Sequence, residues 1–248
     1  TGWHPEDVIY QPWISYGAST SMVLDNHEQV HLCFNDTVTK ELKYACRRDQ
    51  GWQFQTVATN CGGYFEVDIA VDVYGNPHIV YGNDPEHSTN YACLDESEWL
   101  LEVIDSTNYS LSRSVSIVLD NQNRPHVIYG YSKTKYAIRD NGIWQTEVVG
   151  GYYGNTSASV VLDGYSLPHF FYWDGDCALN HAERVNPHVK VCMPSDYYVP
   201  GSEFKCEVEI YNSSHEPLVQ NPLFVFLEVA GQYFFAPSFS EMDYYRID

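Results

Sequence analysis

Basic residues are scarce in this chain. It has 13 Lys and Arg against 33 Asp and Glu, which gives a formal net charge of −20 at pH 7. Nucleic acids and anionic membranes are bound mainly through Lys and Arg, so this balance argues against both as partners. The sequence also has no apolar run near the roughly 18 residues that a membrane-spanning helix needs. We therefore expect no nucleic-acid partner and no membrane span.

Sequence motifs of common catalytic and metal sites are lacking as well. There is no G-x-S-x-G, no H-E-x-x-H and no phosphate-binding glycine loop. No C-x-x-C pair has the spacing of a zinc ribbon or a haem attachment site. We assign no catalytic residue. Whether the protein is an enzyme stays open, with a non-catalytic role as the favoured interpretation.

What the sequence does contain is one unit written four times. In every copy an apolar run ends on Asp and a His follows six residues later, and the first three copies then carry a Tyr-Ala pair with a Trp eight residues after the Tyr. The repeated Asp and His are Asp25, His31, Asp72, His78, Asp120, His126, Asp163 and His169. The tryptophans of this pattern are Trp52, Trp99 and Trp144. A period of about 40 to 50 residues with several short β-type runs is typical of propeller blades.

Each unit divides into four strand-like runs separated by turns rich in Asn, Asp and Gly. In the third copy the runs are 115–119, 126–129, 135–138 and 144–149, and they are rich in Val, Ile, Tyr and Trp. The first run is apolar on consecutive residues. We therefore expect it to be the innermost strand of a blade, buried on both faces. The pattern predicts an all-β fold.

The fourth copy lacks its last strand, and a matching segment lies at the other end of the chain. Trp3 and Glu6 have the same spacing as Trp99 with Glu102 and as Trp144 with Glu147. An N-terminal strand that completes the last blade would join the two ends of a ring and leave no free edge. We predict a four-bladed β-propeller closed in this way. The alternative is a piece of a longer propeller.

The repeat stops after residue 187, and a different β pattern follows. Alternating apolar and polar residues at 204–211 indicate a half-buried strand, and about four strands are visible in this part. It resembles the first half of an immunoglobulin-like sandwich, whose complete form has about seven strands. We expect a small C-terminal β-sandwich-like module. Its open edge would either pair with another chain, giving a homo-oligomer or filament, or pack on the propeller.

These observations give the predicted domain boundaries. The propeller is expected at residues 1–187, with a closing strand at 1–13 and blades at about 14–60, 61–107, 108–152 and 153–187. The terminal module is expected at 188–248.

Seven cysteines are present. Cys192 and Cys206 flank a candidate hairpin turn almost symmetrically, so we expect a disulfide between them, and a second one between Cys33 and Cys46 across two strands of the first blade. In the alternative interpretation all seven are small buried residues of a reducing compartment. The chain begins in mid-blade without a Met, and together with the predicted disulfides this favours a processed, secreted protein.

The repeated residues are better explained by structure than by function. A carboxylate at the end of a strand accepts turn N–H groups, and a site assembled from several blades would not repeat identically in each. The repeated tryptophans, with Trp3, are expected to form the packing layer between blades, and sugar stacking by exposed members is the alternative.

Departures from the repeat carry more functional information. The second copy has Asp68 where the others have Ser, with Glu66 two residues earlier on the same face. This pair would bind a cation in the axial channel or act as acid and base. The turn containing Asp174 and Asp176 is a second source of oxygen ligands. We predict no organic cofactor, and Ca²⁺ is the ion that such ligands suit; no metal is assigned from the sequence.

Two of the units resemble a known repeat. The segments 72–81 and 120–129 are similar to the Asp-x-x-Gly-x-Pro-His-[Ile/Val]-x-Tyr repeats of secreted bacterial β-propellers, distant relatives of sialidase-like and lectin propellers. The resemblance covers about residues 14–184. The first and fourth copies depart from it, because Gln29 stands before His31 and a different turn precedes His169. The resemblance implies the fold and leaves the function open.

Two functional hypotheses follow. In the first, the protein is an extracellular, non-catalytic binding or assembly module that recognises a glycan or a protein and self-associates through the terminal module. In the second, it is a glycan-active hydrolase or lyase that uses Glu66 and Asp68 in the propeller channel. A lectin with one sugar site per blade lies between the two.

Overall fold

The structure is a computed structural model of the 248-residue chain. It describes residues 2, 5–9, 19–62, 65–83, 85–106, 114–130, 133–150, 158–173, 178–184, 188–192, 207–211, 226–229 and 232–235. These residues form strands and turns, and no helix occurs among them. The chain divides into two compact units, Thr1–Arg184 and Val185–Asp248, each of which is described by itself.

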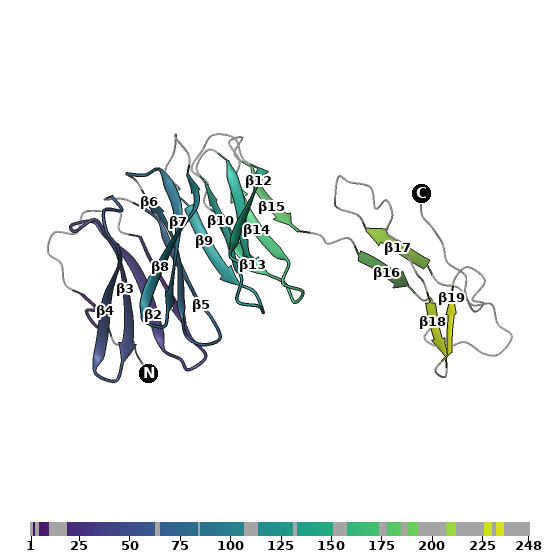
Figure 1. The fold of residues 1–248 in the computed structure, drawn as a ribbon, viewed down its shortest axis with the longest axis horizontal. Helices are drawn as coiled ribbons and strands as arrows, with labels where there is room; N and C mark the ends of the chain where they lie inside the picture. Colours follow the sequence, from purple (N-terminus) through teal and green to yellow (C-terminus); the bar gives the residue numbers. More distant parts are fainter. Residues whose placement is uncertain are drawn as a thin grey trace. The chain divides into compact units, whose positions relative to one another are not determined.

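Four antiparallel sheets follow one another along the first unit, and we call them blades 1 to 4 (Figure 1). Blade 1 contains β1 (Thr20–Leu24), β2 (Val30–Asp36), β3 (Glu41–Arg48) and β4 (Gly51–Ala58). Blade 2 contains β5 (Val67–Val71), β6 (Pro77–Asn83), β7 (Ser88–Asp95) and β8 (Glu98–Ser106). Blade 3 contains β9 (Ser114–Leu119), β10 (Pro125–Gly130), β11 (Thr134–Asp140) and β12 (Ile143–Gly150). Blade 4 contains β13 (Ala158–Leu162), β14 (Pro168–Trp173) and β15 (Leu179–Glu183).

The strands are arranged alike in every blade. Neighbours in sequence pair in order, and the first strands of successive blades lie against one another, β1 on β5, β5 on β9 and β9 on β13. Blade 4 has three strands among the described residues, as expected from the missing fourth run. The predicted all-β fold with four-stranded antiparallel blades is therefore confirmed for blades 1 to 3.

The second unit contains two hairpins among its described residues. β16 (His188–Cys192) pairs with β17 (Glu207–Tyr211), and β18 (Phe226–Val229) pairs with β19 (Gln232–Phe235). The rest of the predicted sandwich-like pattern lies outside the described residues. The predicted closing residue Trp3 also lies outside them.

The turn after the first strand of each blade has one backbone form. In all four blades the third residue after the Asp has a left-handed backbone conformation, with φ between 58° and 86°. These residues are Glu28, Gly75, Asn123 and Ser166. Left-handed backbone costs least for Gly and is tolerated by Asn. This explains why the related repeats place Gly at that position, although this chain does so only in blade 2.

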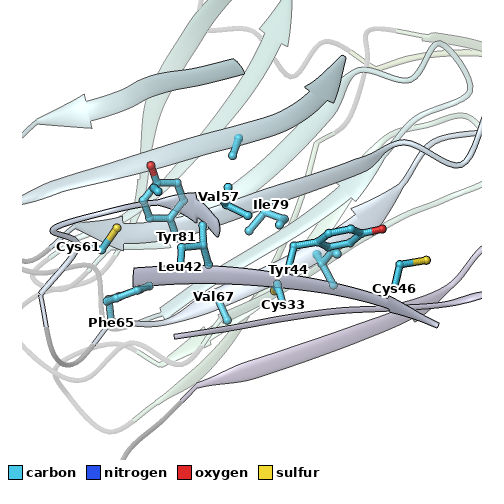
Figure 2. Close-up of a cluster of buried hydrophobic side chains, with 13 residues drawn as sticks. Cys33, Leu42, Tyr44, Cys46, Val57, Cys61, Phe65, Val67, Ile79 and Tyr81 are labelled. Carbon is cyan, nitrogen blue, oxygen red and sulfur yellow. The ribbon is translucent and has the colours of Figure 1, made fainter. Parts of the chain in front are cut away.

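The hydrophobic core is divided among the interfaces between blades. Side chains of blade 1 such as Leu42 and Tyr44 pack with Val67, Ile79 and Tyr81 of blade 2, as Figure 2 shows. A second cluster joins blades 2 and 3, and a third joins blades 3 and 4. Each blade is therefore stabilised mainly by burying apolar surface against its neighbours.

Burial differs from the prediction for the innermost strand. β1 is only partly buried, with Met22 and Leu24 63% and 54% exposed, whereas every residue of β6 and of β10 is buried. The prediction that the first strand is buried on both faces was wrong. The second strand has a hydrogen-bonded strand on each side and a blade over its faces, while the first strand is the edge of its sheet.

The predicted disulfide between Cys33 and Cys46 was also wrong, because both thiols are free. Cys33 lies opposite Tyr44, and Cys46 lies opposite His31, so the two cysteines are diagonal neighbours across β2 and β3. Diagonal partners have Cα atoms about 7 to 8 Å apart, beyond the reach of a normal disulfide. Figure 2 shows both side chains within the apolar cluster. The other predicted disulfide involves Cys206, which lies outside the described residues.

Within the part of the chain that the structure describes, there is no helix of sufficient length and apolarity to cross a bilayer.

A conservative substitution tests the contribution of the tyrosine in each blade. Tyr136→Phe should lower the free energy of unfolding by about 1 to 3 kcal/mol, because it leaves a buried imidazole nitrogen of His126 without its hydrogen-bond partner. Urea denaturation measures the change. Tyr165→Phe is the matched control, since Tyr165 is 86% exposed. Equal stability of the two variants would contradict the assignment.

Candidate functional site

The repeated Asp, His and Tyr lie side by side in blades 1 to 3, where one His nitrogen is hydrogen-bonded to the Tyr hydroxyl and the other faces the Asp. In blade 3, Asp120 Oδ1 accepts the N–H groups of Gln122 and Arg124, each at 2.8 Å. Asp120 Oδ2 lies 3.4 Å from His126 Nε2, and His126 Nδ1 is hydrogen-bonded to the Tyr136 hydroxyl at 2.7 Å. Asp, His and Tyr are all buried. A buried polar group satisfied in this way stabilises one conformation.

Blades 1 and 2 repeat this Asp–His–Tyr arrangement with small differences in the distances. The Nδ1–hydroxyl distance is 2.7 Å for His31 with Tyr44 and 2.5 Å for His78 with Tyr91. The Nε2–Oδ2 distance to the blade's own Asp is 3.4 Å in blade 1 and 3.7 Å in blade 2. Because the same contacts recur, this set holds each blade together and offers no unique site.

Burial lowers the pKa of His31, His78 and His126 below its ordinary value, against the opposing attraction of the neighbouring Asp. The turn N–H groups act on the carboxylates. A backbone hydrogen bond from Gln29 lowers the pKa of Asp25, and one from Leu167 lowers that of Asp163. The three histidines are therefore neutral and the carboxylates ionised near pH 7.

Asp68 and Glu66 are placed by the structure at the contact between innermost strands. Asp68 Oδ1 accepts the Ser21 hydroxyl of blade 1 at 2.6 Å, and Oδ2 accepts the Ile117 N–H of blade 3 at 2.9 Å. Glu66 is exposed and accepts the Ser19 hydroxyl at 2.7 Å. Asp68 thus links three blades, and its carboxylate is already occupied by donors. Asp174 and Asp176 lie outside the described residues.

A different set of residues lies between blades 2 and 3. Glu102 on β8 receives Arg139 on β11 through two hydrogen bonds, at 2.8 Å from Nε and 2.6 Å from Nη2. Trp144 on β12 donates its indole N–H to Glu102 Oε2 at 2.8 Å. The Trp144 ring meets Tyr91 edge to face, with centroids 5.2 Å apart. We call Glu102, Arg139 and Trp144 the blade 2/3 cluster.

Related contacts recur beside the other blades. Arg47 and the Trp52 indole both donate to Glu6, the latter at 3.3 Å, and the Arg47 guanidinium lies 5.9 Å from the Trp52 ring centre. We call this set the blade 1 cluster. Arg184 donates to Glu147 at the border of blades 3 and 4. Glu102 and Glu147 come from the outer strand of the blade that precedes the Arg, and Glu6 comes from the N-terminal segment.

Between blades 1 and 2 the charges are missing. Trp99 donates to Gln55 at 2.7 Å, and the position that holds Arg in the other blades is occupied by Leu94. The acid and the base are thus replaced together. A lone Glu or Arg at this place would lack its partner, whereas a neutral pair needs none.

The charged clusters are accessible from solvent. Arg139 and Glu102 are 30% and 29% exposed, and the other two pairs are between 44% and 51% exposed. The bidentate hydrogen bonds of Glu102 hold the pKa of Arg139 above its ordinary value. An exposed guanidinium, carboxylate and aromatic ring together can donate to, accept from and stack on a polar ligand.

The sequence contained part of this signal. The acid three residues after Trp3, Trp99 and Trp144 marks the outer strand in the sequence, with Gln55 in its place in the first copy, and the tryptophans are interpreted there as packing between blades. The arginines three residues after Tyr44, Tyr136 and His181 were missed. Comparison of this position across the four copies of the repeat reveals the three arginines and the exception at Leu94.

No protein-family model matches the sequence, and no curated protein matches it significantly. Several solved lectin structures have a similar fold. The lectin SapL1 in complex with alpha methyl fucoside has a TM-score of 0.53 at 13% identity, covering 90% of this chain and 81% of that one. A mutant of the Aleuria aurantia lectin AAL in complex with Fucalpha1-6GlcNAc has a TM-score of 0.51 at 13% identity, covering 90% and 72%.

A mutant of AofleA from Arthrobotrys oligospora has a TM-score of 0.52 at 12% identity. That match covers 68% of this chain, which spans only 53% of the AofleA length. The SapL1 and AAL matches extend beyond the first unit of this chain. At these identities the likeness shows the fold, which is that of the β-propeller lectins.

Acidification should destabilise the protein through the buried histidines. Their pKa values are depressed in the folded state, so below the unfolded value of about 6.5 the unfolded chain binds protons that the folded one resists. Stability is complete above that pH and is lost as pH falls towards the lower folded pKa. Urea midpoints of wild type and His126→Gln between pH 7.5 and 5 measure this.

The comparison with the variant removes the effect of the large net charge, which is common to both. The stability difference between wild type and His126→Gln should shrink as the pH falls. A difference that is constant or that grows on acidification would contradict the proposed titration.

Proposed function

We propose that this protein is a non-catalytic carbohydrate-binding protein whose charged inter-blade clusters hold the sugar. The observation that carries the proposal is the recurrence of a solvent-accessible Arg–Glu pair, joined by a Trp in two of three cases, at the borders of blades 2 and 3 and of blades 3 and 4 and at Glu6 beside blade 1. A set required only for packing would also appear between blades 1 and 2. There the chain replaces both charges and keeps the Trp, so the packing of that interface does not need them.

The chemistry of the blade 2/3 cluster suits a sugar. The guanidinium of Arg139 offers N–H donors, and the carboxylate of Glu102 accepts from hydroxyls, so that adjacent sugar hydroxyls can be satisfied by both. Trp144, which is partly buried and packs edge to face on the buried Tyr91, supplies an aromatic surface for the apolar face of the sugar ring. Few, well-placed polar groups beside aromatic side chains are typical of sites for small polar ligands.

The similar solved structures support the same class of ligand. SapL1 and AAL are described in complexes with a fucoside and a fucosylated disaccharide. We infer that fucosides are suitable first ligands to test on this chain, and that recognition is directed at extracellular glycans.

The alternative function, a glycan hydrolase or lyase using Glu66 and Asp68, is disfavoured by the contacts of these residues. Asp68 accepts hydrogen bonds from Ser21 of blade 1, Ile117 of blade 3 and its neighbour Ile69, so contacts between blades already account for its carboxylate. Its substitution of the repeated Ser is explained by the link it makes between three blades.

Arg139→Ala should remove one binding site from the protein. Loss of charged hydrogen bonds worth about 1.5 to 3 kcal/mol corresponds to roughly 10- to 100-fold weaker binding at that site. Isothermal titration with methyl α-fucoside, preceded by a glycan array to select further ligands, measures affinity and stoichiometry. Lys43→Ala, which alters an ion pair within blade 1, is the matched control.

The neutral interface offers a converse experiment. The double variant Gln55→Glu with Leu94→Arg recreates the charged pair beside Trp99 and should add a site without loss of the others. Failure of wild type to bind any glycan on the array, or unchanged stoichiometry in Arg139→Ala and in the double variant, would refute the proposal.

We further propose that the N-terminal segment completes blade 4 and closes a four-bladed ring. Glu6 contacts Arg47 and Trp52 of blade 1 in the way that Glu102 of blade 2 contacts Arg139 and Trp144 of blade 3. This contact of Glu6 supports a closing strand at the N-terminus. Apolar side chains are exposed at both ends of the row of blades, namely Met22, Leu24 and Phe54 on blade 1, and Val161, Phe171 and Leu179 on blade 4. Closure would bury both sets.

Cross-linking tests closure. Cysteines placed at Asp7 and Asn180, which would pair in a closed ring as Val148 and Lys135 do in blade 3, should be joined within one chain by a short bismaleimide. A cysteine pair at Asp7 and Glu96 should not react in this way. Peptide mapping of a product formed only between chains would instead indicate a larger assembly, and absence of any specific product would contradict closure.

The second unit carries the remaining proposals. We propose that it is an immunoglobulin-like β module that mediates attachment or self-association of a secreted protein. The alternating pattern of residues 204–211 and the hairpin of β16 with β17 support a sandwich-like sheet.

A further inference from the structure

Blade 4 gathers three metal-ligating side chains that the other blades lack. Single ligand atoms of His169, His181 and Glu183 all lie within 4.8 Å of one another. His169 Nδ1 is 3.4 Å from His181 Nε2 and 3.3 Å from Glu183 Oε2. None of these three residues is buried.

The set arises from two departures at repeated positions. In blades 1 to 3 the His Nδ1 is hydrogen-bonded to a Tyr hydroxyl, and His181 stands at the position of that Tyr. Two residues further on, Cys46, Cys93 and Ile138 are replaced by Glu183. His181 thus puts an imidazole where the other blades have a Tyr hydroxyl, and Glu183 puts a carboxylate where blades 1 and 2 have a Cys and blade 3 has an Ile. They face the same ligand atom of His169.

A carboxylate of blade 4 also lies beside the other ring nitrogen of His169. His169 Nε2 lies 3.6 Å from Asp163 Oδ2, and Asp163 Oδ1 accepts the N–H groups of Tyr165 and Leu167. A carboxylate on the second nitrogen of a ligating His fixes its tautomer and orientation, and such pairs are usual around protein-bound zinc. The Asp–His pair that serves the fold in every blade thus leaves His169 Nδ1 directed at His181 and Glu183.

We propose that His169, His181 and Glu183 form a zinc-binding site with three protein ligands. Zinc bonds to imidazole nitrogen at about 2.0 to 2.1 Å and to carboxylate oxygen at about 2.0 to 2.2 Å in tetrahedral sites. Ligand atoms at such distances are separated by roughly 3.4 Å, close to the two separations seen around His169 Nδ1. The fourth position is left for water or another ligand.

The donor set selects the kind of ion. Two imidazoles and one carboxylate suit Zn²⁺ and its neighbours in the transition series, whereas Ca²⁺ and Mg²⁺ prefer sites made of oxygen. The formal net charge of −20 also attracts cations to the surface. This site differs from the Ca²⁺ ligands expected at Asp68, Glu66, Asp174 and Asp176.

The zinc site and the proposed sugar site lie on opposite faces of blade 4. Strand residues alternate between faces, so Glu183 and Arg184 point away from each other. Phe170 and Ala182 pack towards blade 3, while His169, His181 and Glu183 occupy the other face. In blades 1 to 3 that face is covered by the next blade. An ion bound here would lie at the border between blade 4 and the blade that follows it.

Zinc titration of the metal-free full chain tests the proposal. Wild type should bind one more Zn²⁺ than His181→Tyr and Glu183→Ile, or bind it at least tenfold more tightly. His181→Tyr restores the residue of the other blades and is therefore expected to fold, which far-UV circular dichroism of the metal-free protein checks. His87→Gln, at an exposed turn, is the matched control and should keep wild-type binding.

Cobalt substitution provides a second measurement. Co²⁺ bound to two nitrogens and an oxygen in tetrahedral geometry gives visible absorption that is much stronger than that of the hydrated ion. This absorption should appear in wild type and His87→Gln and be absent from His181→Tyr. The same zinc stoichiometry and affinity in wild type and folded His181→Tyr, or a cobalt spectrum that the variant leaves unchanged, would overturn the site.

Discussion

The architecture depends on a buried tyrosine that is bound on both sides. Within its own blade, the hydroxyl of Tyr91 is hydrogen-bonded to His78, whose other nitrogen faces the turn Asp. Across the interface, the Tyr91 ring meets Trp144 of the next blade, and that Trp donates back to Glu102 on the outer strand of the first. The same network of contacts therefore orders the strands within a blade and holds neighbouring blades together. The second, third and outer strands all contribute to it.

Because this network stabilises the blades, residues at other positions of the repeat can differ from blade to blade. The functional proposals rest on these differences. Loss of the charged pair at Gln55 and Leu94 leaves the Trp99 contact intact, so the pair is not needed for packing. Exchange of the Tyr for His181 puts a ring nitrogen in place of the hydroxyl beside the repeated His and changes what the two residues can bind. A repeat protein can acquire a site in one blade with little change elsewhere, because each blade packs mainly on its immediate neighbours.

Much of the fold could be predicted because the four copies of the repeat can be aligned with one another. The Asp that ends one run and the His that follows marked the blades, their strands and their tight turns. The pairing of Cys33 with Cys46 failed because spacing does not give register, and a shift of two residues separates the thiols. The candidate site was predicted only in part, since Trp and Glu are close in sequence whereas Arg139 reaches Glu102 from a different blade.

The sequence by itself determined the number of strand-forming units described here and the chemistry of each turn, because local spacing and backbone preference specify them. The tertiary structure decided which residues meet across blades. It placed Asp68 between three inner strands, brought Glu6 to Arg47 and Trp52, and set His169 against His181 and Glu183. These contacts follow from strand register and from the stacking of blades, which join residues that are distant along the chain or diagonal across a sheet.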